Sequence, residues 1–309
     1  MKFQLNDPVP SWLLEGDISI QYQTYRDLLE KEKPALRNKI STEGWGLKLL
    51  SCRNPTGHWG SGFYNPKWTS SHYTLLDLRY LNILPGIKTI AESLDLIFNV
   101  EKGPDGGIGP FGKGQKCDVC VNGMVLNYAS YFGVDENRIK SVVDFLISKK
   151  MVDGGFNCRV QTSGATHSSL HTTLSVLEGI EEYKRNNYHY KLPELNQIER
   201  DAQEFILMHH LYKSDKTGNI IKQDFMKLYY PGRWYYDILK SMDYFQSAQL
   251  PYDKRLVDAL ELLQSKKTKE GYWLLEATHP GKSYFEMEKK GKPSRWNTLR
   301  ALRVLKYYS

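Results

Sequence analysis

The chain has 309 residues and a formal net charge of +7, and 40% of its residues are hydrophobic and 25% charged, a composition typical of a soluble protein. No apolar run approaches the ~20 residues of a membrane-spanning helix, and the N-terminus lacks an apolar core of signal-peptide length, so we expect a cytoplasmic protein. The positive charge suits an anionic partner. Because most basic residues alternate with acidic ones, we expect a small molecule rather than nucleic acid.

One local pattern recurs along the chain, an apolar residue flanked by glycine in a predicted turn. These turns lie at residues 57–60, 106–109, 154–156, 218–220 and 271–273. A repeat of roughly 50 residues indicates stacked supersecondary units, each of which buries its apolar face against its neighbours.

The segments between the turns have helical periodicity. An apolar segment follows each turn, and a more charged, amphipathic segment precedes the next one. The apolar segments are 68–84, 119–133, 168–179, 233–248 and 295–307. The amphipathic segments are 35–52, 87–100, 136–149, 192–213 and 253–267.

This alternation predicts an all-α protein, an α/α toroid of about five inner and outer helix pairs. An open superhelix is the alternative. We favour a closed ring because the inner segments are too apolar to leave one side in water. We expect a single domain over residues 1–309, in which residues 1–34 form a helical cap with one amphipathic segment at 12–29 and residues 35–309 hold the helical pairs.

Basic residues and tryptophans gather at the predicted starts of the inner helices. If these helices are parallel, their starts share one mouth of the ring, where helix N-termini favour anions. The basic candidates are Lys67, Lys113, Lys116, Arg159, Arg233 and Arg295. The aromatic candidates are Trp68, Trp234, Tyr235 and Trp296. Such a mouth suits an amphiphile with an anionic head and an apolar tail, and the alternative is that the basic residues cap loops and stack on tryptophan.

Cysteine and histidine residues supply a possible metal site. Cys117 and Cys120 form a Cys-x-x-Cys pair, and Cys158 and His171 follow at the next helix start. His171 lies about one repeat of roughly 50 residues after Cys120, so the two side chains are expected on neighbouring helices. Thiolate and imidazole ligands favour zinc. The alternative is a set of small buried thiols beside capping histidines.

From about residue 35 onward, the glycine turns and alternating helix pairs resemble the terpenoid cyclase and protein prenyltransferase superfamily. In the β-subunits of protein prenyltransferases, zinc is held by an Asp-x-Cys at one inner-helix start and a His at the next. Asp118-Val119-Cys120 and the run that begins at His171 are similar to these motifs. Lys113 and Lys116 are similar to the Arg-x-x-Lys pair that binds diphosphate there, although Lys replaces Arg and the offset differs by one.

The resemblance implies a zinc-dependent prenyltransferase-like enzyme that acts on an isoprenoid diphosphate, with Asp118, Cys120 and His171 as ligands. The additional Cys117 and Cys158 depart from the family pattern and would complete a closed, structural zinc site. A toroidal binding protein for an apolar ligand or peptide is therefore one alternative. Another is a class II terpene cyclase-like enzyme with Asp118 as the catalytic acid, although the chain lacks the Asp-x-Asp-Asp motif of those enzymes. The heterodimeric relatives also need a partner subunit.

Overall fold

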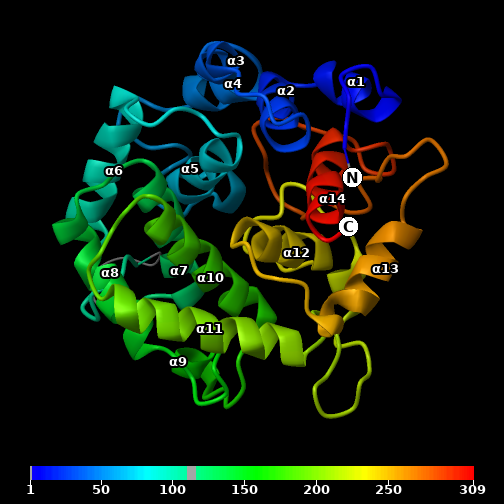
Figure 1. Cartoon of the computed structure of the whole chain (residues 1–309). Coiled ribbons are helices and arrows are strands. Elements are labelled where there is room, and N and C mark those ends of the chain that lie inside the picture. The colour runs from blue at the N-terminus through cyan, green and yellow to red at the C-terminus, as the bar shows by residue number, and fades with distance from the viewer. Residues whose placement is uncertain (1, 110–115) are drawn as a thin grey trace. The chain divides into compact units, whose positions relative to one another are not determined.

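The structure is a computed structural model that describes residues 2–109 and 116–309 (Figure 1). These residues form α-helices, short 3₁₀-helices and one π-helical turn, and their β-structure consists of isolated bridges alone. The predicted all-α class is therefore confirmed. Within the described ranges, no helix combines the length and hydropathy that crossing a membrane requires.

The chain divides into two compact units, which are described here one at a time. The first unit contains residues 1–52, 80–84 and 209–309, and the second contains residues 53–79 and 85–208. The predicted ring and the predicted single domain both depend on how these units are placed. They stay predictions.

The second unit contains three helix pairs that follow the predicted alternation (Figure 1). The pairs are α5 (Ser71–Tyr80) with α6 (Lys88–Val100), α7 (Val119–Tyr131) with α8 (Glu136–Ser148), and α10 (Leu170–Arg185) with α11 (Leu192–Met208). A 3₁₀ turn, η2 (Lys67–Thr69), precedes α5, and the short α9 (Val160–Ser163) precedes α10. Every residue of α7 except Cys120 is buried, whereas α8 buries residues at the spacing of one helical face.

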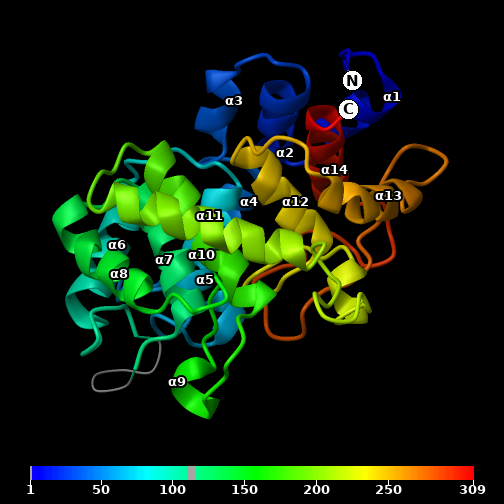
Figure 2. The same cartoon turned by 60° about the horizontal axis from the view of Figure 1, so that its bottom comes forward.

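Helices α7 and α10 lie side by side in both views (Figures 1 and 2). Gly123 permits their close approach, because a Cβ atom added there would lie 2.6 Å from the carbonyl oxygen of Ser175. Further along, the Asn127 side chain donates a 2.8 Å hydrogen bond to the carbonyl of Glu178. The contacts advance in the same direction along both helices, so the two helices are parallel and their N-termini lie at one end of this unit.

The predicted glycine turns share one hydrogen bond that the sequence did not reveal. In four of them, the buried apolar residue donates its backbone N–H to a polar side chain near the start of the following helix. The pairs are Trp59 with Ser71 (3.0 Å), Ile108 with Asn122 (2.7 Å), Phe156 with Thr173 (3.0 Å) and Trp273 with Thr298 (3.0 Å). The fifth predicted turn differs, because Ile220 is 42% exposed and does not fill the core as the other four residues do.

The first unit contains the N-terminal helices and the C-terminal part of the chain. Its elements are α1 (Pro8–Leu14), α2 (Ile18–Gln23), the π-helical η1 (Thr24–Leu28), α3 (Pro34–Lys39), α4 (Gly44–Ser51), η3 (Gln223–Met226), α12 (Ile238–Ser247), η4 (Lys254–Leu256), α13 (Val257–Ser265) and α14 (Arg295–Tyr307).

Two predicted segments of this unit are divided in the structure. The segment predicted at 12–29 contains the end of α1, then α2 and η1, because the Asp17 carboxylate caps a new helix by accepting a 3.0 Å hydrogen bond from the N–H of Ser19. The same carboxylate accepts a 2.7 Å hydrogen bond from the N–H of Trp45. The segment predicted at 35–52 is likewise two helices, α3 and α4, and the second begins at Gly44, which has a φ of +64°.

Helix α12 begins later than the segment predicted at 233–248. Arg233 has a φ of +54°, a left-handed conformation that no right-handed helix includes. The helix begins instead after Asp237, whose carboxylate caps it by accepting a 2.8 Å hydrogen bond from the N–H of Lys240. By contrast, α7 and α14 begin at Val119 and Arg295, where the sequence predicted inner helices.

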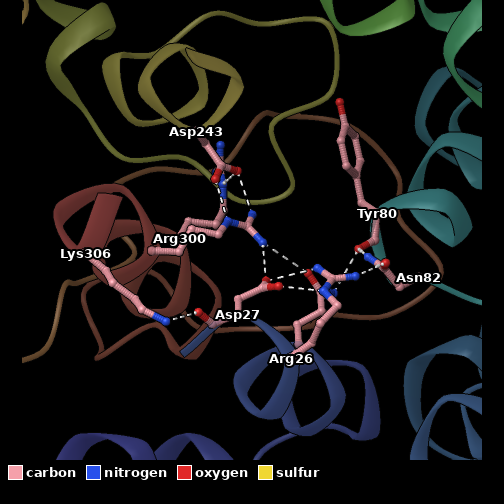
Figure 3. Close-up of polar contacts among 9 residues, drawn as sticks. Arg26, Asp27, Tyr80, Asn82, Asp243, Arg300 and Lys306 are labelled. Atoms are coloured by element: carbon pink, nitrogen blue, oxygen red, sulfur yellow. Dashed lines mark hydrogen bonds and ion pairs between the residues drawn. The ribbon is translucent and has the colours of Figure 1, made fainter. Parts of the chain in front are cut away.

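A network of charged side chains connects α12, α14 and the N-terminal helices within the first unit (Figure 3). The Asp243 carboxylate accepts hydrogen bonds from Nε of Arg300 at 3.0 Å and from Nε of Arg303 at 2.6 Å. Arg303 also donates to the Asp27 carboxylate at 2.8 Å. Asp27 in turn pairs with Arg26, which donates to the side chain of Asn82 at 2.6 Å. Three chain segments are thereby held by partners of opposite charge, and the neutral side chain of Asn82 joins a fourth segment to them.

Candidate active site

The N-terminal ends of α7 and α10, together with the segment before α5, gather chemically active side chains within the second unit. Asp118 is the N-cap residue of α7, but its carboxylate makes no capping hydrogen bond. Asp135, in the same position before α8, caps in the usual way by accepting a 2.8 Å hydrogen bond from the N–H of Asn137. The carboxyl group of Asp118 is therefore not used to close its own helix.

The environment of Asp118 favours the protonated acid. Burial raises the pKa of Asp118 above its usual value, and the nearby ammonium group of Lys67 only partly opposes that shift. These two residues occupy equivalent positions in successive repeats, which explains why they are neighbours. Lys67 and Asp118 each lie four residues before the side chain that anchors a glycine turn, Ser71 and Asn122 respectively.

Two thiols lie beside Asp118. The sulfur of Cys158 accepts a 3.1 Å hydrogen bond from the backbone N–H of Cys120 and a 3.6 Å hydrogen bond from the hydroxyl group of Thr172. Hydrogen bonds lower the pKa of Cys158. They come from the thiol and the backbone N–H of Cys120 and from the hydroxyl group of Thr172. The pKa of Cys120 is raised by its hydrogen bond to Cys158 and by burial. Within the pair, ionisation is therefore easier at Cys158 than at Cys120.

Aromatic side chains pack next to this site. The hydroxyl groups of Tyr64 and Tyr73 lie 3.1 Å apart, and the His72 ring contacts both residues, with centroid distances of 5.5 and 4.7 Å. Nδ1 of His72 lies 3.2 Å from the hydroxyl oxygen of Tyr128, and burial lowers the pKa of His72 to about 3, so its ring is neutral. Asp118, Cys120 and Cys158 all interact electrostatically with Tyr64. The carboxyl group, the thiols and the aromatic rings therefore form one cluster.

No sequence pattern pointed to Tyr64, His72, Tyr73 or Tyr128 as site residues. The repeat of the glycine turns could have pointed to the first turn of α5. Ser71 accepts a hydrogen bond from the first glycine turn, as Asn122 does from the second. The contacts among the rings depend on side-chain directions and were not predictable from spacing.

The remaining residues predicted for this end of the unit have different surroundings. Cys117 is buried, and its backbone N–H donates a 3.0 Å hydrogen bond to the carboxylate of Asp105. Burial and Asp105 raise the pKa of Cys117 to about 12. Lys116 and Arg159 are exposed, and Lys113 lies outside the described residues.

The structure does not test the predicted zinc site. Structural and catalytic zinc sites need three or four protein ligands that converge on one point. Among the side chains of the described ranges, no group of three or more His, Cys, Asp or Glu residues is arranged to hold a metal. The structure brings Cys120 and Cys158 together beside Asp118, whereas the backbone N–H of Cys117 is bound by Asp105. Zinc therefore stays a prediction from the sequence.

The candidates in the first unit pack against its own side chains. The guanidinium of Arg295 lies 4.5 Å from the ring centroid of Trp12 and donates a 2.9 Å hydrogen bond to the carbonyl of the same residue. Trp296 stacks on Tyr230 at 4.8 Å, and its backbone N–H donates a 3.0 Å hydrogen bond to the carboxylate of Glu288. The start of α14 is thus already occupied by a carboxyl group of the protein.

The other pair of candidates in this unit precedes α12. Trp234 and Tyr235 stack at 3.9 Å, and Tyr235 stacks in turn on His279 at 3.7 Å. Arg233 is buried, and its carbonyl accepts a 2.9 Å hydrogen bond from the ammonium of Lys240. The predicted mouth shared by both units depends on their placement and stays a prediction.

Comparison with known proteins gives only distant structural similarities. No family model matches the chain, and no curated protein matches it. One solved structure of type II terpene cyclase MstE from Scytonema, without ligand, has a TM-score of 0.36 and 11% sequence identity. A variant of that cyclase in complex with merosterolic acid A, its product, has a TM-score of 0.34 and 12% identity. Each similarity covers 88% of this chain and 96% of the cyclase chain, but TM-scores this low carry no argument about fold or activity.

Proposed function

We propose that the chain is an enzyme that protonates an unsaturated isoprenoid, with Asp118 as the acid, and so starts a cyclisation of the class II terpene cyclase type. The observation that carries this proposal is the state of Asp118. Its carboxyl group heads a buried helix without capping it, and burial raises its pKa. General-acid catalysis requires a carboxyl group that keeps its proton to a higher pH than an ordinary aspartate does, and the direction of this shift favours that.

The residues around Asp118 support the same chemistry. Asp118 transfers its proton to one carbon of a double bond, the π electrons form the new C–H bond, and positive charge develops on the other carbon. The ring of Tyr64 lies close enough to interact with Asp118 electrostatically, and Tyr73 and Trp68 pack behind it with a centroid distance of 4.8 Å between them. The faces of such rings stabilise cations. The carboxylate left on Asp118 has the ammonium of Lys67 nearby.

The test is an incubation with geranylgeranyl diphosphate in normal and in heavy water. Proton-initiated cyclisation conserves the mass of the substrate and leaves the diphosphate attached. We therefore expect an isomer of the substrate by mass spectrometry, without released diphosphate, and the incorporation of one solvent deuterium in heavy water. The fully saturated diphosphate is the matched control, since it offers no double bond. Release of diphosphate without deuterium incorporation would contradict the proposal.

A second candidate function is zinc-dependent transfer of an isoprenoid to a thiol, as the resemblance to protein prenyltransferases implies. The observation in its favour is that Cys120, Cys158 and Asp118 lie together at the start of α7. This candidate predicts close to one zinc per chain by elemental analysis, release of diphosphate during turnover, and loss of the metal in the double variant Cys120→Ser with His171→Ala. A metal-free protein that still turns over its substrate would eliminate it.

A further inference from the structure

The thiols of Cys120 and Cys158 are a pair of neighbouring reactive side chains in the second unit that the proposed acid chemistry does not use. They are 38 residues apart in sequence, and the Cys158 sulfur lies 3.1 Å from the backbone nitrogen of Cys120. The two thiol groups share a hydrogen bond, and both cysteines are free and half-buried.

The geometry also favours the pair of Cys120 and Cys158 over the Cys-x-x-Cys pair of Cys117 and Cys120. Cys117 is buried, and its Cβ atom lies beside Gly107. Asp105 binds both the backbone N–H and the thiol of Cys117. Cys120 is the one residue of α7 that is not buried, and its side chain is directed to Cys158. A disulfide requires the two sulfurs to approach from hydrogen-bond distance to ~2.05 Å.

We propose that Cys120 and Cys158 form a reversible disulfide, which ties the start of α7 to the chain segment before α9. The co-reactant is a small-molecule disulfide. One protein thiolate attacks a sulfur of that molecule and releases one small thiol, and the second protein thiolate then displaces the other. The two protein thiol protons end on the two released small thiols, the cysteines lose two electrons, and the small disulfide gains them.

This bond would change the surroundings of Asp118. The hydrogen bond that Cys158 accepts from the N–H of Cys120 lies at the first turn of the helix that Asp118 heads. Oxidation redirects both sulfurs and fixes that turn to the neighbouring segment. We expect slower turnover in the oxidised protein. Only this effect on turnover rests on the proposed function, because the bond itself is detected without any substrate.

The experiment is peptide mapping after equilibration of the whole chain with oxidised and reduced glutathione and alkylation of the remaining thiols. Cleavage after Lys and Arg places Cys117 and Cys120 in peptide 117–138 and Cys158 in peptide 151–159. We expect these two peptides to be joined in the oxidised wild type and in Cys117→Ser, and separate in Cys120→Ser and Cys158→Ser. Cys52 should be alkylated in every sample and serves as the internal control.

The bond should also be reversible, so that excess reduced glutathione restores two separate peptides. Three results would overturn the proposal. They are a disulfide between Cys117 and Cys120 within peptide 117–138, full alkylation of Cys120 and Cys158 after oxidation, and stoichiometric zinc that keeps the pair reduced. An unchanged circular dichroism spectrum of Cys120→Ser and Cys158→Ser shows that a missing linkage is not caused by unfolding.

Discussion

Replacement of Asp118 by asparagine is expected to lower turnover of an unsaturated isoprenoid by about 10²–10⁴-fold, the usual contribution of a positioned general acid. Asparagine has the shape of aspartate but carries no acidic proton. It is also a good N-cap residue, so α7 should be retained. Steady-state rates and a circular dichroism spectrum of the same preparation separate loss of chemistry from loss of structure.

The matched control is Asp135→Asn. Asp135 is the N-cap residue of α8 and lies on the surface, where its carboxylate accepts a hydrogen bond from Asn137. We expect this variant to turn over at the wild-type rate. If Asp118→Asn also did so, the acid would have to be another residue and the proposed function would lose its basis.

The pH profile gives a second readout of the same acid. The reactive form is the protonated carboxyl, and burial raises the pKa of Asp118 from its ordinary value of 3.8. Turnover should therefore be highest below the raised pKa and fall as the pH rises through it. Lys67 lowers the pKa of Asp118, so removal of its charge in Lys67→Met should move the falling limb to higher pH.

Much of the secondary structure was predictable because apolar periodicity and glycine turns report local burial. The outer helix predicted at 136–149 is Glu136–Ser148 in the structure, and the inner helix predicted at 295–307 is Arg295–Tyr307. Periodicity failed where one backbone conformation or one cap decided the outcome. The left-handed φ of Arg233 delays α12, and the Asp17 carboxylate interrupts the N-terminal segment. Neither effect changes the spacing of hydrophobic residues in the sequence.

The candidate site was predictable only in part. The repeat length predicts that the starts of α7 and α10 are neighbours, and the contact between Cys120 and the residues before α10 agrees with it. The Cys-x-x-Cys spacing was a poor guide, because Cys117 precedes α7 and Cys120 lies within it, and the two residues have different partners. A motif of two cysteines specifies their separation along the chain, but the direction of each side chain depends on what packs against it.

Replacement of Asp243 by asparagine is expected to destabilise the first unit by about 3 kcal/mol, the lower end of the cost of breaking a buried ion pair. Arg300 and Arg303 would remain in place without this counter-ion (Figure 3), and the side chains of Asp243 and Arg303 are each only 16% exposed. The free energy of unfolding in urea, measured for both proteins at pH 7, gives the difference. Arg303 still has Asp27 as a partner, so a larger loss is not expected.

The pH dependence of that difference identifies its electrostatic origin. Burial alone would raise the pKa of Asp243, but Arg303 and Arg300 outweigh burial and hold the pKa below its ordinary value of 3.8. The stabilisation is therefore fully present above about pH 4, the ordinary range of an aspartate in the unfolded chain, and is lost as the pH falls through the lower pKa of the folded protein. The two proteins should accordingly converge in stability under acid conditions.

The control variant is Asp95→Asn. The Asp95 side chain is 62% exposed in its pair with Arg138, so its replacement should lower the free energy of unfolding by less than about 1 kcal/mol, as for other surface ion pairs. An equal loss in both variants would mean that the network around Asp243 contributes no more than a surface pair.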